Sequence, residues 1–150
     1  MKIHRTKKVN GFELEFYVET NRIPENVQNS WQFDLVYQMS QNAASSGQVR
    51  AMLDKYQYIT TELYDIRVPQ EFLNQAGRTG VILGVPSKKV PEYMDLPISK
   101  AKIVSIILLN VQELKYAIER GAEGRKILAE KLTQEGGTVN SLDRPSVVLS

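Results

Sequence analysis

The longest apolar run in the chain covers residues 102–109, with the sequence KIVSIILL. Its β-branched side chains are typical of a strand that is buried on both faces of a sheet. A single helix that begins at Pro97 is the alternative, because periodicity alone does not separate a strand from a buried helix over so short a run. The β-branched content favours the strand, which we expect at the centre of the fold.

A long amphipathic helix is predicted directly after this run. Asn110 and Glu113 have the spacing of a capping box, in which both side chains satisfy backbone N–H groups at the start of a helix. Apolar residues then recur at helical spacing at Val111, Leu114, Ile118, Leu128 and Leu132. We therefore expect a helix over 111–135, notched at Gly121 and Gly124.

The N-terminal segment has the pattern of a β-hairpin. Asn10-Gly11 is the pair that two-residue type I′ turns prefer, and apolar residues alternate with polar ones after it. A two-residue turn pairs Val9 with Phe12 and Lys8 with Glu13, so it sets the register of the whole hairpin.

Two cations of this hairpin depart from the alternation. The same register places Arg5 beside Phe16 and Lys7 beside Leu14, on the apolar side. One interpretation is an edge strand, where inward-leaning charges discourage edge-to-edge pairing and their stems cover apolar surface. The other interpretation is an anion site lined by both cations.

Two helices are predicted over 24–44 and 48–66. Apolar residues recur at a spacing of four in the first, and a helical pattern runs from Val49 to Ile66 in the second. The connection between them is short and ends near Gly47, which implies an antiparallel pair of helices. We interpret their apolar stripes as core and not as a cofactor pocket.

A short helix over 69–76 and a strand over 80–85 are expected next. Between them, Gly77-Arg78-Thr79-Gly80 is the segment of the chain closest to a phosphate-binding loop. It precedes a strand, however, and lacks the Lys-Ser/Thr ending that such loops carry before a helix. Arg78 nevertheless stays a candidate for anion binding.

Residues 86–100 are expected to form an irregular loop, because prolines interrupt them repeatedly. A loop of this length inside a compact domain is either functional or mobile. Four lysines flank Tyr93 and Met94 in this part of the chain: Lys88, Lys89, Lys100 and Lys102. They form either a basic rim around the two apolar residues or an ordinary solvated surface.

The C-terminal tail, residues 136–150, ends on apolar side chains. Val147, Val148 and Leu149 are adjacent, whereas a structureless terminus is normally polar. We expect the tail to dock, either on its own domain or as an added strand on a neighbouring subunit.

These elements predict one α+β domain over 1–135. An N-terminal β-hairpin and two further short strands form the β part, with an αα-hairpin and a C-terminal amphipathic helix packed on one side. The length of 150 residues fits a single domain with a sizeable core.

The composition removes most catalytic chemistry. The chain has no cysteine, which excludes disulfides, thiol catalysis and thiolate metal sites, and His4 is its single histidine. Glu62 and Asp65, one turn apart on a predicted helix, are a carboxylate pair that would need further ligands to hold Mg²⁺. We expect no catalytic residue, no metal and no cofactor, and an enzyme is the less favoured class.

Charge and targeting signals narrow the class further. The net charge of +2 is too small to mark a polyanion-binding protein. The N-terminus lacks the apolar segment of a secretory signal, and no window has the length and apolarity of a membrane span. We expect a cytoplasmic protein without a membrane partner.

Three classes of function are compatible with the sequence. The first is a non-catalytic binding or assembly protein, a homo-oligomer that self-associates through Val147, Val148 and Leu149. The second is a nucleic-acid-binding accessory protein that uses Arg5, Lys7, Lys8, Arg78, Lys88, Lys89 and Lys100. The third is an enzyme or sequestering protein for a small phosphorylated ligand. Scattered positive charge favours the first, a contiguous basic groove the second and an enclosed basic pocket the third.

Overall fold

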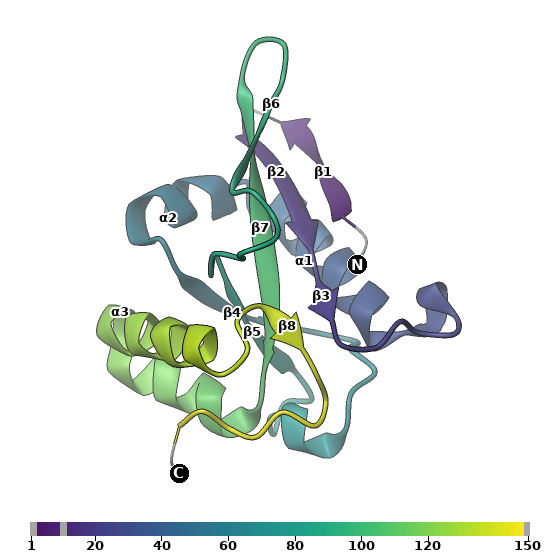
Figure 1. Ribbon diagram of the computed structural model, residues 1–150, viewed down its shortest axis with the longest axis vertical. Coiled ribbons are helices and arrows are strands. Elements are labelled where there is room, and N and C mark those ends of the chain that lie inside the picture. The colour runs from purple at the N-terminus through teal and green to yellow at the C-terminus, as the bar shows by residue number, and fades with distance from the viewer. Residues whose placement is uncertain (1–2, 10–11, 149–150) are drawn as a thin grey trace.

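The central strand of the structure is β7, Lys100–Leu109, within a mixed sheet (Figure 1). β2, Phe12–Tyr17, lies parallel to β7 on one side, and β5, Thr79–Leu83, lies antiparallel on the other. β1, Ile3–Val9, and β4, Ile59–Leu63, end the strand order β1-β2-β7-β5-β4. The longest apolar run of the sequence is therefore a strand, as predicted.

The computed structural model describes residues 3–9 and 12–148, and of residues 3–9, 12 and 13 it describes the backbone only. The predicted turn at Asn10-Gly11 and the apolar Leu149 lie outside the described residues. Helices and strands both contribute, so the predicted α+β class is confirmed. The short elements are β3 (Glu19–Thr20), η1 (Val27–Asn29), η2 (Gln70–Phe72), β6 (Tyr93–Asp95) and β8 (Val139–Asn140).

The register of β1 and β2 differs from the prediction. Val9 pairs with Phe12 as expected, but an irregularity follows, and Arg5 then pairs with Glu15 and not with Phe16. A bulge shifts one strand by a residue and exchanges its two faces. Here the shift moves a cationic residue from an apolar position to one opposite a carboxylate. The predicted pairing of Arg5 with Phe16 is therefore wrong.

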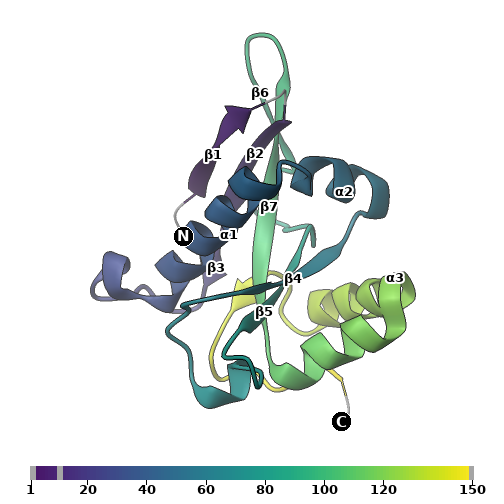
Figure 2. The ribbon, with the colours of Figure 1, turned by 180° about the vertical axis from the view of Figure 1, so that it is seen from behind.

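α1, Trp31–Ser46, begins where the Ser30 hydroxyl accepts a hydrogen bond from the Phe33 N–H, at 3.2 Å, and ends at Gly47. α2, Val49–Tyr56, leads away from its end and does not form an antiparallel pair with it (Figures 1 and 2). The predicted continuation of this helix to residue 66 is wrong, because residues 59–63 form β4.

α3, Val111–Gln134, confirms the predicted cap and notch. The Asn110 side chain accepts from the Glu113 N–H at 2.9 Å, and the Glu113 carboxylate accepts from the Asn110 N–H at 3.1 Å. Gly121 has φ 60° and ψ −141°, and the helix folds back there, so that two helical segments lie against each other (Figure 2).

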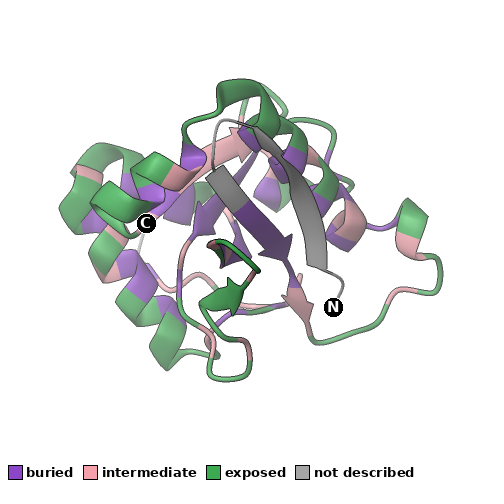
Figure 3. Cartoon of the chain, turned by 90° about the horizontal axis from the view of Figure 1, so that it is seen from above, coloured by how far each residue is buried: buried purple, intermediate pink, exposed green. Residues whose placement is uncertain are grey.

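The sheet separates two cores, so the predicted packing of all helices on one side is wrong. One core joins α1 and α2 to residues of β7 such as Ile106 and Leu108. The other joins α3 to Ile107 and Leu109. Successive residues of a strand point to opposite faces, so a strand that is apolar throughout needs cover on both. Figure 3 shows buried strands between helices whose outer surfaces are exposed.

Two local predictions also need correction. The expected short helix over 69–76 is only the turn η2. The expected irregular loop over 86–100 contains β6, which pairs with β7 so that Tyr93 lies opposite Lys102. We refer to residues 93–102 as the β6–β7 hairpin, and it extends beyond the rest of the sheet in Figure 1.

Candidate interaction surface

The candidate anion-binding residues lie in separate places. Arg78 directly precedes β5 and stacks on the ring of Tyr64, 4.5 Å from its centre. Lys88 and Lys89 line a hollow of about 320 Å³ together with the end of α3 and with β8. Lys100 belongs to the β6–β7 hairpin. The basic rim of lysines around Tyr93 and Met94 stays a prediction.

The side chains of Arg5, Lys7 and Lys8 are outside the described part of the structure. An anion site built on these three cations therefore stays a prediction.

The glycine-rich loop before β5 is closed by Asn74. The Oδ1 atom of Asn74 accepts from the Ala76 N–H at 3.0 Å and from the Arg78 N–H at 2.9 Å. The Gly77 N–H donates to the Asn74 carbonyl at 2.9 Å. A phosphate-binding loop needs such N–H groups to point at the ligand. In this loop they are already satisfied within the protein.

Glu62 and Asp65 do not share a helix, because Glu62 lies in β4 and Asp65 follows it with φ 57°. The Glu62 carboxylate accepts a hydrogen bond from Asn74 Nδ2 at 2.6 Å. Among the described residues, no group of three or more His, Asp or Glu side chains is arranged to hold a metal ion. The carboxylate pair therefore has no further protein ligands in this part of the chain.

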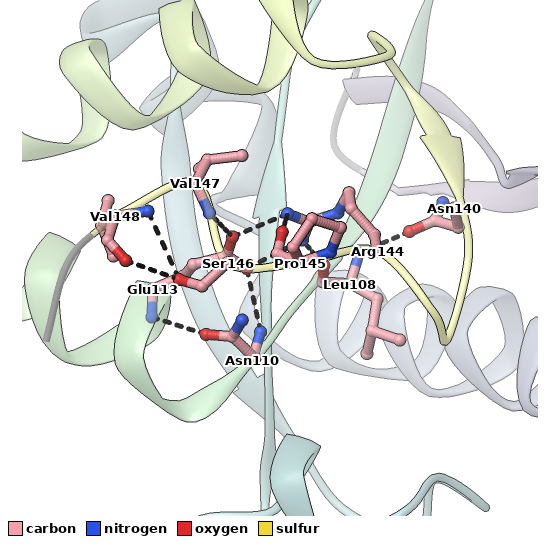
Figure 4. A network of polar contacts seen from close by, with 9 residues as sticks. All are labelled: Leu108, Asn110, Glu113, Asn140, Arg144, Pro145, Ser146, Val147 and Val148. Carbon is pink, nitrogen blue, oxygen red and sulfur yellow. Dashed lines mark hydrogen bonds and ion pairs between the residues drawn. The ribbon is translucent and has the colours of Figure 1, made fainter.

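A buried ion pair fastens the tail to the start of α3 (Figure 4). Arg144 donates to both carboxylate oxygens of Glu113, at 2.7 and 2.8 Å, and to the Leu108 carbonyl at 3.1 Å. The Val147 N–H donates to the same carboxylate at 2.9 Å. With the capping bond from Asn110, Glu113 accepts four hydrogen bonds although its side chain is fully buried. The tail is thus held at the junction of β7 and α3.

The apolar end of the tail packs on its own chain. Val148 is buried in the α3 core, and Val147 packs against the same core. Val148 therefore has little surface left for a neighbouring subunit, whereas Val147 is only partly buried, and self-association through the tail stays a prediction. Asn140 adds a second attachment, because its Oδ1 accepts from the Leu108 N–H at 2.7 Å and its Nδ2 donates to the Ile106 carbonyl at 2.9 Å.

A hollow of about 680 Å³ lies between η2, the start of α3 and the tail. A large cavity is the usual first candidate for a ligand site. The only cation in its lining is Arg144, which is already paired with Glu113. The hollow therefore offers no uncompensated positive charge for an anionic ligand.

Among the groups that the structure describes, Tyr17 has a clearly shifted pKa. Its pKa is raised to about 12, chiefly by burial; the charges of Glu19 and Glu92 act in the same direction, and hydrogen bonds with Ser87 and Ser105 act in the opposite one. A phenol that holds its proton so firmly does not serve as a base near neutral pH. Tyr17 therefore keeps its proton near neutral pH.

The β6–β7 hairpin displays apolar side chains to solvent. Ile98, at its tip, is 89% exposed, and Tyr93 and Met94 are 43% and 40% exposed. Tyr93 also lies under the Lys102 ammonium, 5.3 Å from the ring centre, and Lys102 approaches Asp54 of α2 to 3.8 Å. The sequence pattern indicated Tyr93 and Met94 but not Ile98. Its position between Pro97 and Ser99, residues typical of turns, is the feature that indicates exposure.

Comparison with protein-family models, with curated proteins and with solved structures returned no match. In the part of the chain that the structure describes, no helix is long and apolar enough to cross a membrane.

Proposed function

We propose that this protein is a non-catalytic binding protein that self-associates through the β6–β7 hairpin. The observation that carries the proposal is the concentration of exposed apolar side chains on this projecting element. Single exposed apolar residues are normal on a protein surface, but a group of them marks an interaction site. Tyr93, Met94 and Ile98 form such a group within six residues.

The hairpin is suited to contact a second copy of itself. Tyr93 and Met94 point to opposite faces of β6, so both faces and the tip carry apolar surface. Asp95 pairs across the strands with Lys100, so the element contains both signs of charge. Two copies related by a twofold axis can place these opposite charges against each other. A net charge of +2 adds little repulsion between copies.

The two alternative functions have less support. A nucleic-acid groove requires a contiguous basic surface, whereas Arg78, Lys88 and Lys100 lie in different parts of the molecule. A pocket for a small phosphorylated ligand requires several free donors; the backbone N–H groups of Ala76 and Arg78 are bonded to Asn74, which leaves the Arg78 side chain.

Sedimentation velocity over a range of protein concentrations tests the proposal. The native protein should sediment faster as its concentration rises into the micromolar range, and Ile98→Asp should remain a monomer. Ile23→Asp is the matched control, because Ile23 is 84% exposed but lies away from the hairpin. A native protein that stays monomeric up to roughly 100 µM contradicts the proposal. So does an Ile98→Asp variant that associates like the native protein.

A further inference from the structure

A second surface, separate from the hairpin, forms where the end of α2 meets the bend of α3 (Figures 1 and 2). It combines tyrosine rings with cations, and we call it the tyrosine–cation face. The Lys55 ammonium lies 5.1 Å and the Arg125 guanidinium 5.9 Å from the centre of the Tyr56 ring. The residues of the face are Lys55, Tyr56, Tyr58, Tyr116, Arg120 and Arg125.

The cations of this face are held in place. Arg125 donates from Nε to the Tyr58 carbonyl at 3.2 Å, which connects α3 to the start of β4. The Arg120 guanidinium lies 4.4 Å from the centre of the Tyr116 ring. Gly124 permits this arrangement, because a Cβ atom there would lie 2.5 Å from the Cβ of Arg120. The side chains are thus ordered before any partner arrives, which lowers the entropic cost of binding.

Five other cations of the described part of the chain are held in ion pairs. Arg50, Arg67, Lys102, Lys115 and Arg144 each have a carboxylate within ion-pair distance. Among the side chains that the structure describes, none provides such a carboxylate for Lys55, Arg120 or Arg125. Lys55 and Arg120, which are exposed, and Arg125, which is half-buried, therefore keep positive charge that a partner can neutralise.

We propose that the tyrosine–cation face binds an acidic segment of a partner protein. Guanidinium groups bind carboxylates through paired hydrogen bonds, and tyrosine and arginine are frequent at the energetic centres of protein interfaces. Single-stranded nucleic acid is the less suitable ligand, because its bases stack on open aromatic faces. Cations already lie over the rings of Tyr56 and Tyr116.

A glutamate-rich peptide of about eight residues is a suitable probe, titrated at low salt and followed by amide NMR shifts. We expect binding with shifts centred on Tyr56, Tyr116 and Arg125, and at least about tenfold weaker binding by Arg120→Gln. Lys115→Gln is the matched control, because Lys115 lies on the same helix and is paired with Glu119. It removes the same charge and should change the affinity by less than about twofold.

Three results would overturn the proposal. The first is no shift at peptide concentrations near 1 mM, where even weak binding is visible. The second is equal weakening by Arg120→Gln and Lys115→Gln, which would indicate unspecific attraction. The third is tighter binding of a single-stranded oligonucleotide that Arg120→Gln abolishes, which would identify a nucleic-acid site. The hairpin variant Ile98→Asp keeps the face intact, so a failure of self-association leaves this test unaffected.

Discussion

Glu113 links three parts of the molecule through one side chain. It caps α3, neutralises Arg144 and accepts the N–H of Val147 in the tail. A buried carboxylate is tolerated only when its charge and its lone pairs are satisfied, and here both conditions depend on the tail. The tail is therefore part of the domain core in energetic terms, although its sequence follows the last helix.

Replacing Arg144 by methionine should destabilise the fold strongly, because it leaves a buried carboxylate without a counter-charge. We expect Arg144→Met to lower the free energy of unfolding in urea by about 3–5 kcal/mol. Lys115→Met removes an exposed pair with Glu119 and should cost less than about 1 kcal/mol. Equal losses of unfolding free energy in the two variants would show that the buried Arg144–Glu113 pair stabilises the fold no more than the exposed Lys115–Glu119 pair.

Tyr17 contributes stability that the protein loses at high pH. Its folded pKa of about 12 is above the ordinary value of 10.0, so the folded state resists loss of the proton. The stabilisation is complete below pH 10 and is lost as the pH rises towards 12.

The raised pKa of Tyr17 corresponds to a contribution of roughly 2–3 kcal/mol to the free energy of unfolding. We expect the free energy of unfolding in urea to fall more steeply with pH between 10 and 12 in the native protein than in Tyr17→Phe. The other titrating groups are present in both proteins, so they cancel in the comparison. Parallel pH dependences of the two proteins would contradict a raised pKa at Tyr17.

At the scale of elements, Gly84 is the residue directly after the end of β5. It has φ 94°, and a Cβ atom there would lie 2.3 Å from the backbone carbonyl oxygen of Gln57. Gly77 also has a positive φ, 75°, but its Cβ position is open. A side chain at Gly77 would therefore cause backbone strain alone, whereas one at Gly84 would cause strain and a steric clash.

Gly77→Ala should cost roughly 1–2 kcal/mol of unfolding free energy, the usual strain of a side chain with positive φ. Gly84→Ala should cost clearly more, because the backbone of Gln57 must also move. Thermal unfolding followed by circular dichroism compares the two variants. A Gly84→Ala variant as stable as Gly77→Ala would show that the backbone at Gln57 can move at little cost in free energy.

The elements that local chemistry determines were predictable from the sequence. The β-branched run gave the central strand, and Asn110 with Glu113 gave the start of α3. β4 was not, because Ile59 and Leu63 are four residues apart, a spacing that fits both a helix and an alternating strand. The bulge in β1 was also missed, since a turn sets a register only until an extra residue enters the ladder.

At the scale of the molecule, the side on which each helix packs depends on chain crossings that no local pattern encodes. The same holds for the candidate contact surfaces. Tyr93 and Met94 stood out in the sequence, whereas the hollow that Lys88 and Lys89 line together with the end of α3 and with β8 did not. The tyrosine–cation face was not predicted, because α2 and α3 are far apart in the sequence and meet only in the fold.

Self-association through the β6–β7 hairpin is tested most directly by hydrogen exchange at two protein concentrations. Backbone amides that enter a contact exchange more slowly, whereas the rest of the fold is unaffected. We expect peptides that cover residues 93–102 to gain protection when the concentration rises from about 1 µM to about 100 µM, and peptides around Ile23 to stay unchanged. Unchanged exchange in the hairpin over this range, or protection that appears only elsewhere, would contradict the account.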